Sequence, residues 1–293
     1  MAIEAGAKVI CDTIQRALDN DHGALIGRNG TIELEQMINI TSNKLHILEK
    51  NAGIYPIAIH RFFYKWQEDS IKATQAADVL ATGWYEPLKD AEELALERWN
   101  VKAKKVPLRS LEPYYVDKDQ QWTQLLSGHK VAVVTSFAKS ASEQVSKLQE
   151  VWGSNNILPH DVEWAWIQTG HARSVARGRN EWPPHIHSWA HATEYVVGEV
   201  MNSGARFALI GCGGLGMPIA KMLKDRGIIT IVLGGAIQVL FGIKGNRWRN
   251  HDVISGFWND AWVWPSESET PAGADMIEGG CYWLSEATKQ GKN

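Results

Sequence analysis

The chain has 293 residues, of which 44% are hydrophobic, so it can bury a sizeable core as one large α/β domain or as two intimate halves. Its 30 Lys and Arg residues against 33 Asp and Glu residues leave a net charge of −3, which predicts no broad basic surface for duplex nucleic acid. The three cysteines, Cys11, Cys212 and Cys281, form no C-x-x-C pair, which favours a reducing compartment over a disulfide framework or a zinc knuckle.

The first twenty residues are typical of an amphipathic helix that carries acidic side chains, and they lack the apolar core of a signal peptide. No apolar run approaches the roughly 20 residues that a membrane span needs. We therefore expect a cytoplasmic protein without a membrane span.

Apolar, β-branched runs alternate with helical patterns along the chain, which predicts an α/β fold with a mainly parallel sheet flanked by helices. The predicted strands are 24–27, 78–81, 130–135, 160–169, a run that ends at Gly211, and 228–233. The predicted helices are 1–20, 31–40, 60–77, 89–99, one that begins just after 135 with a capping box at Ser140 and Glu143, 187–201, and one from about 216 to Gly227. Residues 107–115 and 173–184 are predicted to be connections.

No internal repeat, low-complexity tract or long linker divides the chain. We therefore expect one Rossmann-like domain over residues 1–293, with an N-terminal half, 1–127, and a half that contains a glycine-rich turn, 128–293. In such open sheets, ligands bind at the carboxyl ends of the strands, so we expect the cleft there.

The glycine-rich turn is residues 211–216, which read Gly-Cys-Gly-Gly-Leu-Gly after an apolar strand. This is formally the G-x-G-x-x-G turn, whose amides approach a pyrophosphate at a helix N-terminus. Pro218 suits the first turn of the helix that follows. In a dinucleotide-binding unit the next strand ends with an acid for the ribose, but here it leads into Gly234-Gly235. The pattern therefore argues against NAD.

A second glycine turn lies near the N-terminus, where residues 26–35 read Ile-Gly-Arg-Asn-Gly-Thr-Ile-Glu-Leu-Glu. An arginine and two carboxylates between a strand and a helix can hold a diphosphate together with a metal or a hydroxyl nucleophile. The alternative is that Glu33 and Glu35 merely favour the helix dipole. Because the two glutamates are two residues apart, they point in different directions, and only one can readily serve a site.

Eight short segments between residues 23 and 283 carry a resemblance to a known family. They are ALIGRNGTIELE, AADVLATGW, RSLEPYY, WTQLLSGHKVAVVTSFAKSASEQ, ILPHDVEW, ALIGCGGLGMPIAKMLKDRG, GGAIQVLFGIKGNRW and IEGGCYW. Their number and order resemble the GT-D-type glycosyltransferases, and more narrowly a GT-D-like subgroup among bacterial and viral surface-glycan proteins. The resemblance implies transfer of a sugar from a nucleotide-sugar donor to a glycan or other hydroxyl acceptor, on a Rossmann-like fold.

The motif that follows the first strand in that family reads Arg-Phe-Gly-Asp-Gly-Glu, whereas residues 28–33 here read Arg-Asn-Gly-Thr-Ile-Glu. The first metal-binding acid is therefore replaced by Thr31. A hydroxyl cannot replace a carboxylate as a hard anionic ligand, so a requirement for Mg²⁺ or Mn²⁺ is in doubt.

Our site hypothesis is that Glu33 orients or deprotonates the acceptor hydroxyl, while Arg28 and the glycine-rich turn hold the diphosphate. The candidate donor-binding residues are Gly27, Asn29, Gly30, Ser136, Phe137, Gly211, Gly213, Gly214, Gly216, Lys244 and Arg247. Trp248 is the candidate acceptor-binding residue, because an aromatic beside cations and a flexible glycine suits a substrate lip. Glu33 and Glu35 are the candidate ligands if a divalent metal is bound.

Two other functions compete with this hypothesis. An NAD(P)-dependent oxidoreductase would use the glycine-rich turn but lacks the acid for the ribose. A non-catalytic nucleotide- or glycan-binding protein would account for the altered acidic motif and for the 14 Trp residues. Binding of NAD(P)H or of nucleotide sugars, and detection of transfer, separate the three.

Overall fold

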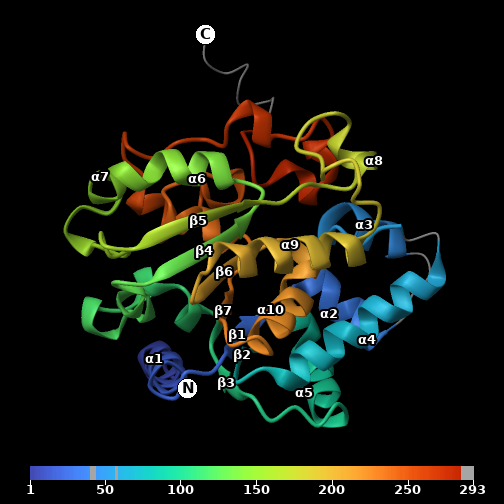
Figure 1. Cartoon of the computed structure of the whole chain (residues 1–293), viewed down its shortest axis with the longest axis horizontal. Coiled ribbons are helices and arrows are strands. Elements are labelled where there is room, and N and C mark those ends of the chain that lie inside the picture. Colours follow the sequence, from blue (N-terminus) through green and yellow to red (C-terminus); the bar gives the residue numbers. More distant parts are fainter. Residues whose placement is uncertain (40–43, 57–58, 285–293) are drawn as a thin grey trace.

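The computed structural model describes residues 1–39, 44–56 and 59–284. Seven strands form one parallel sheet in the order β3-β2-β1-β7-β6-β4-β5 (Figure 1). The strands are β1 (Ala24–Arg28), β2 (Val79–Ala81), β3 (Lys104–Val106), β4 (Lys130–Thr135), β5 (Glu163–Gln168), β6 (Phe207–Gly211) and β7 (Ile229–Val232). The predicted α/β fold with a mainly parallel sheet flanked by helices is confirmed.

The helices cover both faces of this sheet. They are α1 (Ile3–Asp19), α2 (Thr31–Ile38), α3 (Leu45–Ala52), α4 (His60–Ala76), α5 (Lys89–Arg98), α6 (Ala138–Gln144), α7 (Leu148–Trp152), α8 (Arg173–Ala176), α9 (Trp189–Ser203), α10 (Gly216–Lys224) and α11 (Ala236–Leu240). In Figure 1, α4, α9 and α10 lie over the face of the sheet turned to the viewer. The segment after β7, orange to red, lies beside α6 and α8.

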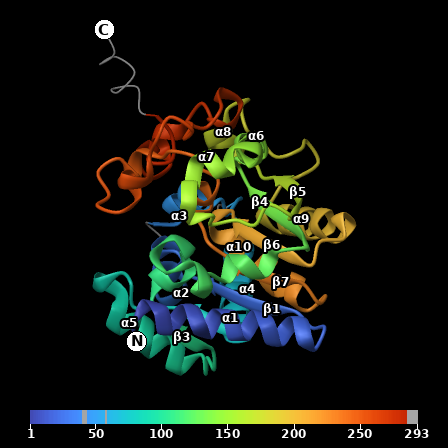
Figure 2. The same ribbon diagram turned by 90° about the vertical axis from the view of Figure 1, so that its left-hand side faces the viewer.

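Alternation along the strands divides the core into two layers, because successive side chains point to opposite faces of a sheet. On β1, Ile26 belongs to the same core layer as Ile14 of α1, whereas its neighbour Leu25 belongs to the layer that contains Trp66 of α4. Figure 2 shows α1 as a separate layer along the lower strands. With both faces covered, the central strands are apolar throughout, which is why β4, β6 and β7 were visible as uninterrupted runs in the sequence.

Several local predictions differ from the structure. The capping box at Ser140 and Glu143 is wrong, because Phe137 is the N-cap residue of α6 and the Ser140 hydroxyl instead donates to the buried carboxylate of Glu269. The connection 173–184 contains the short helix α8. The edge strand β3 and helix α3 had no predicted counterpart. The predicted end of α2 at Ile40 lies outside the described residues.

No helix within residues 1–39, 44–56 and 59–284 has both the length and the apolar character needed to cross a membrane.

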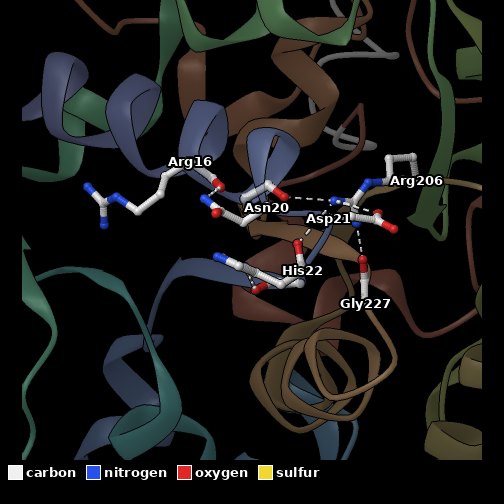
Figure 3. A network of polar contacts seen from close by, with 8 residues as sticks. Arg16, Asn20, Asp21, His22, Arg206 and Gly227 are labelled. Atoms are coloured by element: carbon white, nitrogen blue, oxygen red, sulfur yellow. Dashed lines mark hydrogen bonds and ion pairs between the residues drawn. The ribbon is translucent and has the colours of Figure 1, made fainter.

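Arg206 binds several backbone carbonyl groups at the amino-terminal ends of the strands, opposite the ends where a cleft is expected (Figure 3). Arg206 donates to the carbonyl oxygens of Ala17 at 3.0 Å and His22 at 3.1 Å, and also to that of Gly227. One side chain therefore joins the end of α1, the start of β1 and the turn before β7. Asp21 adds only an outer ion pair at 3.6 Å, with its side chain 97% exposed.

We predict that Arg206→Ala lowers the free energy of unfolding by at least about 2 kcal/mol, because hydrogen bonds that involve a charged group contribute about 1.5 to 3 kcal/mol each. Asp21→Ala is the matched control and should change it by less than about 0.5 kcal/mol, as exposed ion pairs contribute little. Urea unfolding measures both. Equal effects of the two substitutions would contradict this role for Arg206.

Candidate functional site

A cleft of about 1020 Å³ opens at the carboxyl ends of the strands. Each of the seven strands contributes to its wall through the residue that follows it or a near neighbour: Gly30, Thr82, Pro107, Ser136, Thr169, Cys212 and Leu233. The chain runs outward from β1 to β2 and β3 and later returns through β7 on the other side of β1. Ligands of open α/β sheets bind beside such a reversal, and Arg28, Glu33 and Arg247 are among the residues that line the cleft here.

Two arginines meet at Gly234-Gly235, just past the end of β7. A Cβ built on Gly234 would lie 2.1 Å from Nη2 of Arg28. A Cβ built on Gly235 would lie 3.0 Å from Nη1 of Arg247 and 2.8 Å from a ring carbon of Tyr282. A side chain at either position would displace these groups, and Gly234 also has a φ of +58°, which favours glycine. The absence of the ribose acid after this strand therefore has a structural reason.

The surroundings of Arg28 fix its direction. Arg28 is the last residue of β1, so it leaves the sheet at its carboxyl edge. Its guanidinium carbon lies 5.1 Å from the ring centre of Trp84, which follows β2. A planar cation stacked on an aromatic face keeps its edges available for hydrogen bonds to a ligand.

The guanidinium of Arg247 is held by a tyrosine and a glutamate from the C-terminal segment. It donates to Tyr282 Oη and to Glu278 Oε2, both at 3.0 Å, and Tyr282 donates to the other oxygen of Glu278 at 2.9 Å. The ring of Tyr282 also lies under the guanidinium, 4.7 Å from its carbon. This closed set of contacts holds Arg247 against Gly235, next to the Gly234 that Arg28 contacts.

Glu33 lines the same cleft from the first turn of α2. Its carboxylate folds back over Gly30, whose Cβ, if present, would lie 1.9 Å from Oε2. Burial raises the pKa of Glu33, and the nearby Glu278 raises it further, while a hydrogen bond from its own amide and the charge of Arg28 lower it. Because the net shift is upward, this carboxylate is a better proton acceptor than an exposed glutamate.

The other predicted residues of the first motif lie outside the cleft lining. Asn29 is buried, and its amide donates to the hydroxyl of Thr74 in α4 at 3.3 Å. Gly27 allows α10 and β7 to approach, since its Cβ would lie 3.0 Å from both Met217 and Val232. These two residues hold β1 in position. Glu35 is paired with Lys44 beyond α2.

The glycine-rich turn packs against α3. A Cβ on Gly213, whose φ is +57°, would lie 2.9 Å from the carbonyl oxygen of Ala52, the last residue of α3. A Cβ on Gly214 would lie 3.0 Å from Ile54, and that on Gly216 3.0 Å from Val232. A helix C-terminus carries partial negative charge, which disfavours an anion beside it. Gly211 and Gly213 still line the cleft.

The remaining candidates divide between the cleft and the surface. Ser136, Phe137 and Trp248 line the cleft, and Trp248 is only 8% exposed. Lys244 lies over the ring of Trp258, 5.7 Å from its centre and away from the cleft lining. The structure thus brings together Arg28, Gly30 and Glu33 from the first motif with predicted residues of three other segments. These lining residues are Ser136, Phe137, Gly211, Gly213, Arg247 and Trp248.

An aromatic wall forms one part of the lining. Phe137 packs on Trp283 with ring centres 5.9 Å apart, and His171 packs on the same indole at 5.8 Å. Burial lowers the pKa of His171 to about 4, so its imidazole is neutral at pH 7. A neutral, flat and mostly apolar wall suits a ring system such as a nucleobase or the apolar face of a sugar.

Of the two candidate metal ligands, Glu33 lines the cleft and Glu35 does not. Thr31 stands where the resemblance expects the first acid, and Glu35 is occupied by Lys44. Throughout the described part of the chain, no group of three or more His, Cys, Asp and Glu side chains is placed to hold a metal ion.

Sequence reasoning did not find Trp84, Glu278 or Tyr282 as site residues. The signal was present, because Trp84 ends the segment AADVLATGW, and the segment IEGGCYW contains the other two. What was missing was the position of these segments, since only the folded chain places them beside Arg28 and Arg247.

Comparisons of the chain with protein-family models, with curated proteins and with solved structures found no match.

We predict that Glu33→Gln stabilises the protein at pH 7. The pKa of Glu33 is raised in the folded protein, so this side chain contributes to the free energy of unfolding as long as it is protonated. The contribution is fully present below the unfolded pKa of about 4.3 and is lost as the pH rises through the folded pKa. The neutral amide avoids this loss, so the gain in melting temperature should be largest at pH 7 and should vanish near pH 4. Thermal unfolding across this range measures it.

Glu35→Gln is the matched control, because the two carboxylates share a helix but that of Glu35 pairs with Lys44. It should show no gain at pH 7. A melting temperature of Glu33→Gln at or below that of the wild type at pH 7 would contradict the raised pKa of Glu33.

Proposed function

We propose that the protein is a glycosyltransferase that transfers a sugar from a nucleotide-sugar donor to a hydroxyl group of a glycan or other acceptor. The observation that carries the proposal is that Arg28 and Arg247 lie against the neighbouring glycines Gly234 and Gly235, with Glu33 in the same cleft. The resemblance of the sequence to the GT-D-type glycosyltransferases gives the reaction class. The cleft gives the groups that the reaction needs.

The two arginines suit a diphosphate. When the bond between the anomeric carbon and the phosphate oxygen breaks, its electron pair goes to the leaving nucleoside diphosphate, which gains negative charge. Guanidinium groups bind phosphate oxygens through paired hydrogen bonds, and Arg28 and Arg247 are both fixed by aromatic rings before a ligand arrives. Preorganised positive charge of this kind stabilises the leaving group without a metal ion.

Glu33 supplies the base. As the acceptor oxygen forms its bond to the anomeric carbon, the hydroxyl proton passes to the carboxylate of Glu33. Burial raises the pKa of this group, which brings its proton affinity closer to that needed at neutral pH. Its position beside Arg28 places base and leaving-group contacts in one site.

The cleft also has the right size. Its volume of about 1020 Å³ is at the upper end of the roughly 300 to 1,000 Å³ typical of small-molecule sites. It therefore has room for a nucleotide sugar and part of an acceptor together. The wall of Phe137, His171 and Trp283 offers a surface for a ring of either substrate.

We predict that Glu33→Gln lowers kcat by about 100-fold or more, the usual contribution of a general base, and leaves the Kd of the donor within about twofold. Release of nucleoside diphosphate from a panel of UDP-, GDP- and CDP-sugars measures turnover, and calorimetry measures donor binding. The fall of kcat/KM toward low pH should disappear in the variant. Full transferase activity of Glu33→Gln would rule out this role, and donor binding without any turnover by the wild type would favour a non-catalytic binder.

We predict that Gly234→Ala weakens donor binding by about tenfold or more, because the new methyl group displaces Arg28 and costs at least one charge-assisted hydrogen bond to the diphosphate. The positive φ of +58° also costs about 1 to 2 kcal/mol of stability.

Gly128→Ala separates the two effects. Gly128 has a φ of +72° and open space where its Cβ would lie. It is in the turn before β4, at the amino-terminal ends of the strands and away from the cleft. This control should lose similar stability but keep its affinity for the donor. Equal donor affinities of the two variants would contradict the placement of the diphosphate at Arg28.

A further inference from the structure

A second group of polar side chains lines the cleft outside the diphosphate site. Arg109 and Glu112 follow β3, and His251 lies a few residues after Arg247. Nη1 of Arg109 donates to Glu112 at 2.6 Å, and its guanidinium carbon lies 4.8 Å from the ring centre of Tyr115. Nη2 of the same arginine lies 3.1 Å from Nε2 of His251. The function proposed above uses none of these side chains.

The backbone determines which nitrogen of His251 carries a hydrogen. The amides of Val253 and Ile254 donate to Nδ1 at 3.2 and 3.3 Å, so Nδ1 must be the nitrogen with the free electron pair. In a neutral imidazole the hydrogen is then on Nε2. The opposite tautomer would leave the two backbone amides facing an N–H group, and Ile254 is buried where no water can compensate.

Two donors therefore face each other in the cleft. A guanidinium has no acceptor atom, and Nε2 of His251 bears a hydrogen, so the 3.1 Å approach between Arg109 and His251 lacks an acceptor. Glu112 and Tyr115 keep Arg109 in this orientation. An oxygen atom of a ligand that accepts from both groups would satisfy the pair, and a negatively charged oxygen would do so best.

Arg109 and His251 lie near Trp248, the candidate acceptor-binding residue. The amide of His251 donates to the carbonyl oxygen of Trp248 at 3.1 Å, so one short turn carries Arg247 at the diphosphate, Trp248 in the cleft wall and His251 beyond it. A molecule bound against Trp248 can therefore extend from the diphosphate side toward Arg109 and His251.

We infer that Arg109 and His251 form an anion subsite for the acceptor, so that the acceptor glycan carries a carboxylate or phosphate group next to the sugar that rests on Trp248. The assignment of this subsite to the acceptor rests on the proposed function. The anion subsite itself rests only on the two facing N–H groups of Arg109 and His251. In the subsite, one anionic oxygen lies beside the two nitrogens and accepts from both Nη2 of Arg109 and Nε2 of His251, while Glu112 accepts from the other arm of the arginine.

The experiment measures binding with the donor site filled by a saturating nucleoside diphosphate from the UDP, GDP and CDP panel. D-glucuronate and glucose 6-phosphate are the anionic probes, and D-glucose is the neutral counterpart. The wild type should bind at least one anionic probe about tenfold more tightly than glucose, as expected for a charge-assisted hydrogen bond. The two anions distinguish a carboxylate-bearing from a phosphate-bearing acceptor.

Two variants test the residues. His251→Asn can still accept from the amides of Val253 and Ile254 but has no donor at the position of Nε2. Arg109→Lys keeps a positive charge beside Glu112 but loses the planar arm that faces His251. Each should reduce the preference for the anionic probe to below about threefold, with the melting temperature and the affinity for the nucleoside diphosphate unchanged.

The possible failures can be told apart. If nucleoside diphosphates bind but neither anion is preferred over glucose, or if the preference survives in both variants, the subsite is refuted and the proposed function stands. If no nucleoside diphosphate binds, the same titrations are made without it. An anion preference that both variants abolish would then support the subsite and count against the glycosyltransferase.

Discussion

The candidate site depends on the parallel pairing of β7 with both β1 and β6. Ile231 of β7 lies opposite Ile26 on one side and Leu209 on the other. This register brings the ends of three strands together, so that Gly234-Gly235, the motif after β1 and the glycine-rich turn after β6 share one edge of the sheet. Arg206, which precedes β6, binds backbone carbonyl groups that precede β1 and β7, and so joins the same three strands at their amino-terminal ends.

Charge balance at this edge follows from the same arrangement. Arg28 lies against Gly234 and Arg247 against Gly235, and the charge of Glu278 lies near enough to Glu33 to contribute to the upward shift of the Glu33 pKa. Tyr282 holds Glu278 to Arg247, so Arg28 is the less neutralised of the two cations. An incoming diphosphate would supply anionic oxygens that accept from the N–H groups of both guanidinium groups.

Much of the fold was predictable because buried parallel strands leave a direct mark on the sequence. The run at 130–135 is β4 without any change of bounds, and the strand and helix around 211–216 were also recognisable. The edge strand β3 was not, since its two lysines are exposed and only Val106 is buried. Ser140 has the spacing of a cap, yet the acid it bonds, Glu269, lies 129 residues away.

The site was predictable only in part. Arg28 and Glu33 were chosen from a local motif, and the structure places both in the cleft. The glycine-rich turn was chosen by the same kind of reasoning, but its glycines also serve contacts with Ala52 and Ile54 that no local pattern shows. The closeness of Gly234 to Arg28 likewise depends on long-range pairing.

The most direct test of the account is a crystal structure of the protein with the nucleoside diphosphate that binds most tightly. The account predicts the terminal phosphate over Gly234-Gly235, within hydrogen-bond distance of the guanidinium groups of Arg28 and Arg247. A diphosphate seated instead on the amides of residues 213–216, with neither arginine in contact, would contradict it.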